Sequence, residues 1–121
     1  TFLKLRMYNK FMIKNKSKNT IISKNFKMLN NLLSKSKGLI GSNSPETVIF
    51  YTKFGIHTFG MKYPIDVIIT DKKFRVIAIK EVLLPNRIFI WKTKESLVIE
   101  LKQGIIGKSR TEINDYLEII P

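Results

Sequence analysis

The chain contains no cysteine among its 121 residues and only one histidine, His57. The absence of cysteine excludes disulfide bonds and catalysis by a thiol. Any zinc site would have to be built from one imidazole and carboxylates, so we expect neither a metal nor a cofactor. His57 has no nucleophile or pair of carboxylates close to it in the sequence. We therefore assign no catalytic residue and favour a protein that is not an enzyme.

Long hydrophobic runs are also missing. No stretch of about 18 residues is both apolar and uncharged, so no transmembrane helix is predicted. Residues 1–16 interrupt every short apolar run with Lys or Arg, unlike the continuous apolar core of a signal peptide. We therefore expect a cytoplasmic protein.

Acidic residues are absent from the first third of the chain. Residues 1–37 carry ten basic residues, and the first carboxylate is Glu46. Residues 38–121 hold twelve basic and nine acidic residues, so most of the net charge of +13 lies near the N-terminus. Such a segment can neutralise phosphates and release their counterions. The predicted nucleic-acid-binding residues are the cations Lys4, Arg6, Lys10, Lys14, Lys16, Lys18, Lys24 and Lys27.

The same charge has a compositional explanation. The chain is crowded with Lys, Asn and Ile, as expected from an AT-rich genome, an archaeal one included. Net charge informs about association rather than fold. RNA or a ribonucleoprotein is the expected partner of a basic binding module, and a protein partner stays open.

The periodicity predicts one domain over residues 1–121, with a basic strand or arm at 1–19 and a β domain at 20–121. A helix is expected from Phe26 to Lys37, because Asn25 is a suitable N-cap and Leu29, Leu32 and Leu33 repeat at helical spacing. A turn or single helical turn is expected at 103–109. Strands are expected at 2–8 with 11–13, then at 20–23, 47–51, 57–61, 65–70, 75–81, 87–91, 96–101 and 116–120. This pattern is typical of a mainly β fold with one α-helix (α+β), built as a compact small β-barrel or half-barrel from antiparallel hairpins.

One segment resembles a known family. Its motif comprises His57-Thr58-Phe59-Gly60-Met61, then Pro64 and Asp66, two hydrophobic strands, and a turn with Pro85 and Arg87. Upstream, residues 38–41 (GLIG) are similar to the Gly-Leu-Met-Gly of that family, and residues 97–104 (LVIELKQG) are similar to a later motif. The segment resembles the domain-of-unknown-function-192 family over about residues 20–120. The resemblance implies a small β-rich domain and supplies no established reaction.

The same residues suggest a candidate cleft, formed by His57, Met61, Asp66, Arg87 and Glu100. His57 could act as a base or hydrogen-bond a backbone carbonyl, and Met61 is more typical of a core. Asp66 and Glu100 lie in very apolar strands, where a carboxylate must be paired or solvated. Arg87 is a suitable bidentate partner for Asp66. A ligand-binding or hydrolytic cleft lined by these residues is therefore the alternative to a nucleic-acid-binding module.

The sequence Gly107-Lys108-Ser109 does not form a phosphate-binding loop. A Walker motif would need glycine at the position of Lys102, so we exclude a nucleotide triphosphatase.

Overall fold

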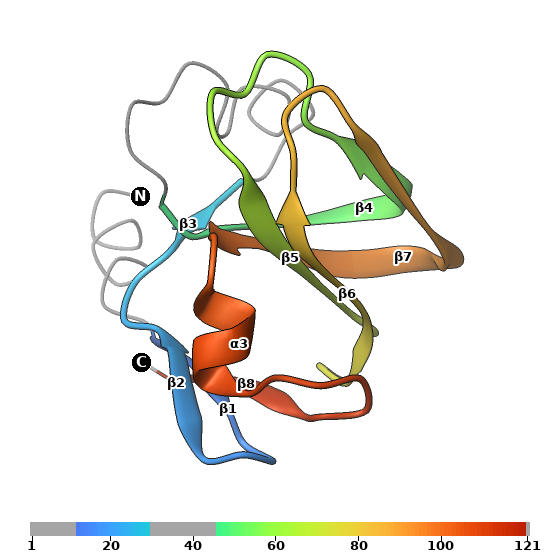
Figure 1. Ribbon diagram of the computed structural model, residues 1–121. Coiled ribbons are helices and arrows are strands. Elements are labelled where there is room, and N and C mark those ends of the chain that lie inside the picture. Colours follow the sequence, from blue (N-terminus) through green and yellow to red (C-terminus); the bar gives the residue numbers. More distant parts are fainter. Residues whose placement is uncertain (1–11, 30–45, 121) are drawn as a thin grey trace, which may run out of the picture.

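The computed structural model describes residues 12–29 and 46–120, the side chains of residues 93–95 excepted. Eight strands and one short helix make up this part of the chain (Figure 1). In chain order they are β1 (Met12–Asn15), β2 (Thr20–Ser23), β3 (Lys27–Met28), β4 (Val48–His57), β5 (Ile65–Thr70), β6 (Val76–Leu83), β7 (Ile88–Lys102), α3 (Ile105–Ser109) and β8 (Leu117–Ile120).

The strands form two sheets. The smaller has the order β2-β1-β8, and the larger has the order β3-β4-β7-β5-β6. All pairings are antiparallel except that of β3 with β4. The mainly β class with one short helix is confirmed. Within the described residues the sheets are not closed into a barrel, so the expected barrel is not found there.

The larger sheet carries a hydrophobic cluster on each face. β5 lies near its middle and is buried along its whole length, because its side chains alternate between the two clusters. Val67 and Ile69 pack with Phe50, Trp91 and Val98 on one face. On the other face Ile68 packs in a second cluster with Ile49, Leu97, Ile99 and Leu101 of the same sheet. The small sheet contributes Ile13, Ile22 and Leu117 to this cluster, and α3 contributes Ile106.

The expected helix from Phe26 is wrong at its start. Lys27 and Met28 form β3, which pairs in parallel with Val48 and Ile49 of β4. Phe26 and Leu29 flank this strand and are buried in opposite core clusters. Their apolar spacing therefore reflects burial beside a sheet, where tertiary contacts outweigh helical propensity. The rest of the expected helix, and the strand at 2–8, lie outside the described residues.

Two other parts of the strand prediction differ from the structure. β4 continues to His57, and a turn follows it, so the expected strand at 57–61 is wrong. Residues 88–102 form one long strand, β7, rather than two. The β5–β6 hairpin and the single helical turn at α3 are confirmed.

Candidate functional site

Asp66 is fully buried, and its carboxylate accepts three backbone hydrogen bonds. Oδ1 accepts from the N–H of Val82 at 3.0 Å, and Oδ2 accepts from the N–H groups of Gly104 at 3.1 Å and Ile106 at 3.0 Å. Three such donors compensate the cost of removing the charge from water. Through these hydrogen bonds, Asp66 in β5 links the start of α3 to β6.

Val82, which donates its N–H to Asp66, has an unusual backbone conformation. Val82 has a φ of 56°, a left-handed conformation that is uncommon for a β-branched residue. It belongs to a β-bulge, because the register skips from Ile65 opposite Leu83 to Val67 opposite Lys80. The predicted pairing of Asp66 with Arg87 is wrong, since Arg87 is exposed and its Nη1 donates to the carbonyl of Asn86 at 3.3 Å.

Asp66 and Glu100 do not face each other. In the antiparallel pairing of β5 with β7, Asp66 lies opposite Leu101 and Val67 lies opposite Glu100. Paired residues share a face and neighbours in a strand alternate, so the two carboxylates lie on opposite faces of the sheet. Acid–base chemistry between them is therefore excluded by register.

Glu100 lies on the face that carries Val48, Val67 and Val98. The residue is 6% exposed, and burial raises the pKa of its carboxyl to about 7. A carboxyl with this pKa is part protonated near neutral pH, which lowers the cost of holding it among aliphatic side chains.

His57 ends β4, and Met61 lies in the turn that follows. The exposed His57 ring stacks on Phe59 at a centroid distance of 5.0 Å, and its Nδ1 accepts from the N–H of Phe59 at 3.2 Å. Met61 is buried in the core cluster. His57, Asp66, Arg87 and Glu100 therefore do not line one cleft.

Thr58 connects this turn to the turn that follows β6. Its Oγ1 donates to the carbonyl of Leu84 at 2.7 Å and accepts from the N–H of Arg87 at 2.9 Å. Its carbonyl accepts from the N–H groups of Met61 and Asn86. The motif residues around Arg87 thus serve a structural junction, in which Arg87 takes part through its backbone.

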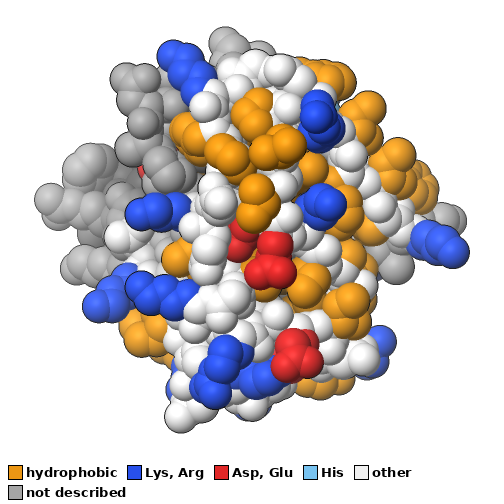
Figure 2. Space-filling model, in the orientation of Figure 1, with side chains coloured by type: hydrophobic (Ala, Val, Ile, Leu, Met, Phe, Trp, Pro, Cys, Tyr) orange, Lys and Arg blue, Asp and Glu red, His pale blue; other side chains and the backbone are white. Residues whose placement is uncertain are grey.

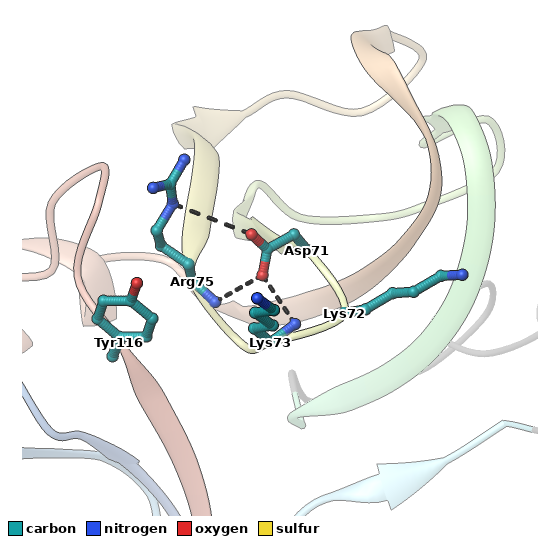
Figure 3. Close-up of a pocket in the computed structure, with 5 residues that line it drawn as sticks. All are labelled: Asp71, Lys72, Lys73, Arg75 and Tyr116. Carbon is teal, nitrogen blue, oxygen red and sulfur yellow. Dashed lines mark hydrogen bonds and ion pairs between the residues drawn. The ribbon is translucent and has the colours of Figure 1, made fainter.

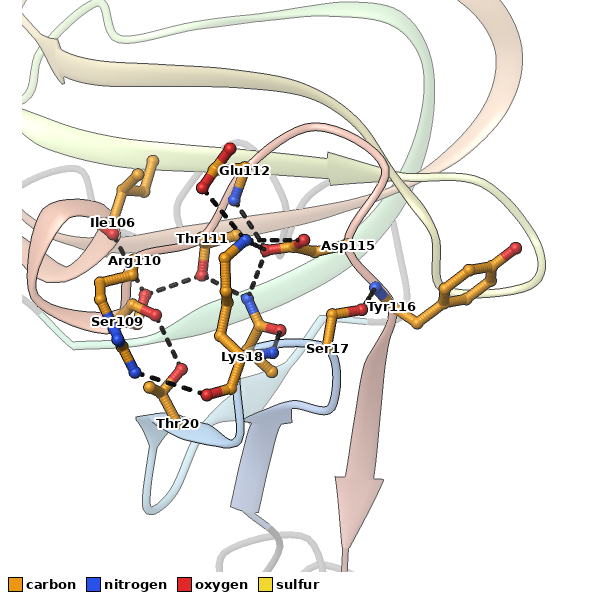
Figure 4. A network of polar contacts seen from close by, with 11 residues as sticks. Ser17, Lys18, Thr20, Ile106, Ser109, Arg110, Thr111, Glu112, Asp115 and Tyr116 are labelled. Atoms are coloured by element: carbon orange, nitrogen blue, oxygen red, sulfur yellow. Dashed lines mark hydrogen bonds and ion pairs between the residues drawn. The ribbon is translucent and has the colours of Figure 1, made fainter.

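The ammonium group of Lys18 takes part in a network of polar contacts (Figure 4). Its Nζ donates to both carboxylate oxygens of Asp115, at 2.9 and 2.8 Å, and lies 3.2 Å from Oε1 of Glu112. The same Asp115 accepts from Nδ2 of the buried Asn15 at 2.9 Å. The network joins the β1–β2 hairpin to the segment before β8. It removes Lys18 from the set of cations available to a phosphate.

The charge of Asp115 is stabilised by this network. Desolvation by itself would raise the pKa of Asp115, but the hydrogen bonds from Asn15, Lys18 and the N–H of Glu112 outweigh it and lower that pKa. The same contacts raise the pKa of Lys18. Both groups are therefore held in their charged forms at neutral pH.

The other predicted cations have different surroundings. Lys16, Lys24 and Lys27 are exposed, and Lys14 is half-buried in β1. Lys4, Arg6 and Lys10 lie outside the described residues. Among the predicted cations that the structure describes, only Lys16 lines a surface hollow that Tyr116 also lines.

Two adjoining hollows meet at Tyr116, whose side chain is half exposed. The first, of about 450 Å³, is lined by Asp71, Lys72, Lys73, Arg75 and Tyr116 (Figure 3). The second, of about 310 Å³, shares Lys73 and Tyr116 and adds Lys16, Ser17, Leu117 and Glu118. We call these two hollows together the Tyr116 groove.

The β5–β6 turn shapes the Tyr116 groove. Oδ1 of Asp71 accepts from the N–H groups of Lys73 at 2.9 Å and Arg75 at 3.0 Å, which closes the turn. Nε of Arg75 lies 3.9 Å from Oδ2 of Asp71. The backbones of Arg75 and Tyr116 form an isolated antiparallel β-bridge, which places Tyr116 beside the β5–β6 turn. In Figure 3 the side chain of Lys72 points away from Tyr116.

The Tyr116 groove does not follow from the sequence pattern. The pattern predicts a hairpin turn at Asp71-Lys72-Lys73, but it does not place Tyr116 beside that turn, because about 40 residues separate them. The available signal was an aromatic residue at the start of the last strand, and that signal is common to ordinary sheet edges.

Within the described part of the chain, no group of three or more metal-ligating side chains is present. No helix in that part is long and apolar enough to cross a membrane.

No family model matches the chain, and no curated protein matches it. Two solved structures are similar to it. A protein of unknown function from Novosphingobium aromaticivorans DSM 12444 has a TM-score of 0.75 and 16% identity, over 89% of this chain and 82% of that one. A Sinorhizobium meliloti 1021 protein, provisionally described as a transcription regulator, has a TM-score of 0.76 and 15% identity, over 89% of this chain and 90% of that one. At this identity, the fold is what the chain shares with them.

Proposed function

We propose that this protein is a non-catalytic binding module for single-stranded nucleic acid, with RNA as its main partner. The observation that carries the proposal is the Tyr116 groove, which a half-exposed aromatic ring lines together with Lys16 and Lys73. Single-stranded nucleic acids are held by stacking of bases on aromatic rings and by cations along the backbone. The groove combines these two elements.

The balance of charge in the groove supports this proposal. Four cations and two carboxylates line it, and Asp71 already accepts two backbone N–H groups and faces Arg75. The net charge of +13 would attract a polyanion over a longer range. The Sinorhizobium meliloti protein of the same fold, with its provisional description as a transcription regulator, is compatible with a nucleic-acid partner.

The experiment is fluorescence anisotropy with labelled mixed-sequence RNA at low salt. We expect Tyr116→Ala to weaken binding about tenfold, because loss of one stacked base costs about 1–3 kcal/mol. Tyr116→Phe keeps the ring and should bind like the wild type. Tyr51→Ala is the matched control, since Tyr51 is 50% exposed and Tyr116 is 46% exposed.

Two results would contradict the proposal. One is an affinity no better than that of an unrelated protein of equal charge. The other is equal loss of binding in Tyr116→Ala and Tyr51→Ala.

Membership of the domain-of-unknown-function-192 family is a second proposal. It is supported by the way the motif residues act together, with Thr58 joined to Arg87 and Asp66 holding the bulge at Val82. A solved member of that family whose matching aspartate accepts the same three backbone N–H groups would support membership. A different role for that aspartate would count against it.

A further inference from the structure

The two-stranded ribbon formed by the end of β4 and the start of β7 exposes an apolar face. In the pairing register, Gly55 lies opposite Ile90 and His57 lies opposite Ile88. Ile88 is 61% exposed and Ile90 is 70% exposed, although isoleucine is usually among the most buried residues. We call this the ribbon face; it comprises Ile88 and Ile90 with the neighbouring exposed rings of Phe54, His57 and Phe59.

The ribbon face points away from the core. Ile56, Phe89 and Trp91 alternate with its residues and point to the opposite side, where they pack on the core cluster that includes Phe50 and Ile65. One side of the ribbon therefore packs on the core, and the side chains on its other side are exposed to solvent. Figure 2 shows hydrophobic side chains gathered on the side of the molecule where Figure 1 places the end of β4 and the start of β7.

Cations accompany these apolar side chains. Segments 53–59 and 87–92 contain Lys53, Arg87 and Lys92 and no acidic residue, and the nearest acidic residue in the register is Glu95, opposite Lys53. All three cations are exposed. Lys92 follows Ile90 by two positions in β7, where the register with β4 shifts, and Lys53 precedes Phe54 on the β4 side of that shift. Protruding apolar side chains beside cations have the chemistry that binds the surface of an anionic bilayer.

We propose that the ribbon face docks on an anionic lipid bilayer, with Ile88 and Ile90 inserted at the interface and the cations against lipid headgroups. A bilayer accepts protruding side chains without a matching pocket, whereas a peptide would need a groove. A second copy of the chain would bring two strongly positive molecules together. This inference uses residues outside the Tyr116 groove and is independent of the proposed function.

The test is co-sedimentation of the full chain with vesicles of phosphatidylglycerol and phosphatidylcholine in equal parts, and with phosphatidylcholine alone. We expect binding to the mixed vesicles and at least about tenfold weaker binding to the neutral ones. The double variant Ile88→Ser with Ile90→Ser should bind the mixed vesicles about tenfold more weakly, because it removes the inserted apolar area. Ile21→Ser with Ile113→Ser is the matched control, since both residues are about half exposed elsewhere.

Charge is tested separately. Lys53→Gln with Lys92→Gln should weaken binding more than Lys102→Gln with Lys108→Gln, although each pair removes two exposed cations. The proposal is overturned by an absence of binding to mixed vesicles, or by unchanged binding in the Ile88 and Ile90 variant. It is also overturned if Tyr116→Ala alone abolishes vesicle binding, since the anion would then occupy the Tyr116 groove. A dimer that dissociates on substitution of Ile88 would instead make the ribbon face a contact between copies.

Discussion

Asp66 and Glu100 are buried carboxylates on adjacent strands, and their side chains point to opposite faces of one sheet. The surroundings that accommodate each buried carboxyl group also differ. Asp66 accepts hydrogen bonds from three backbone N–H groups. Glu100 lies among valines, and its pKa rises to about 7. The first carboxylate is a structural clamp, and the second is sensitive to pH.

Asp66→Asn should destabilise the fold by about 2 kcal/mol or more. The amide group presents a donor where the carboxylate accepted, so at least one of the N–H groups of Val82, Gly104 and Ile106 is left buried without an acceptor. Urea denaturation measures the change. Asp71→Asn is the control, because Asp71 accepts two backbone N–H groups in an exposed turn and should cost much less. Equal losses in the two variants would contradict the clamp.

Glu100 should make the fold less stable as the pH rises from about 4.5 to 7. Its carboxyl titrates near 4.5 when unfolded and near 7 when folded, so over this interval the folded state binds more protons. The free energy of unfolding should fall by about 3 kcal/mol across the interval. Glu100→Gln, measured by urea denaturation at several pH values, should remove this dependence. An unchanged pH profile in the variant would contradict the assignment.

Lys18→Met should raise the pKa of Asp115, because it removes a cation that contacts both carboxylate oxygens. In the native protein the lowered pKa of Asp115 contributes stability above the ordinary value of 3.8, and this contribution is lost as the pH falls through the folded pKa. The variant should therefore show a weaker acid dependence of unfolding. NMR titration of the Asp115 carboxyl reports the pKa directly. Lys16→Met, in an exposed lysine, should leave it unchanged.

Thr58→Val should cost about 1–3 kcal/mol in the free energy of unfolding. The change keeps the shape of the side chain but leaves the carbonyl of Leu84 without the hydroxyl donor and the N–H of Arg87 without that acceptor. Thr58→Ser keeps the hydroxyl and should retain most of the stability. Thermal unfolding followed by circular dichroism compares the two. A larger loss in Thr58→Ser than in Thr58→Val would show that the methyl group matters more.

Much of the fold was predictable from local pattern. Residues 65–70 and 76–83 are rich in β-branched residues around a turn that Asp71 closes, so the hairpin follows from short-range signals. The start at Phe26 of the expected helix was not predictable in this way. Phe26 and Leu29 are spaced as in a helix, but the parallel pairing of Lys27 and Met28 with β4 decides their conformation.

The candidate site was less predictable than the fold. Asp66 and Glu100 were recognised as buried carboxylates, but their separation onto opposite faces depends on a register that the sequence does not contain. The charge pattern predicts that Lys18 binds phosphate, but Asp115, nearly 100 residues later, neutralises it. Tyr116 and Lys73 meet only because β8 returns beside the β5–β6 turn. Long-range pairing therefore accounts for each difference.

In the proposed function, single-stranded RNA binds in the Tyr116 groove. The most direct measurement is photo-cross-linking of the full chain to RNA that contains 4-thiouridine, with the adducts located by mass spectrometry. We expect adducts on the peptide that contains Tyr116, reduced in Tyr116→Ala and unchanged in Tyr51→Ala. Adducts found only on peptides remote from Lys16, Lys73 and Tyr116, or no adduct above that of an equally basic unrelated protein, would contradict it.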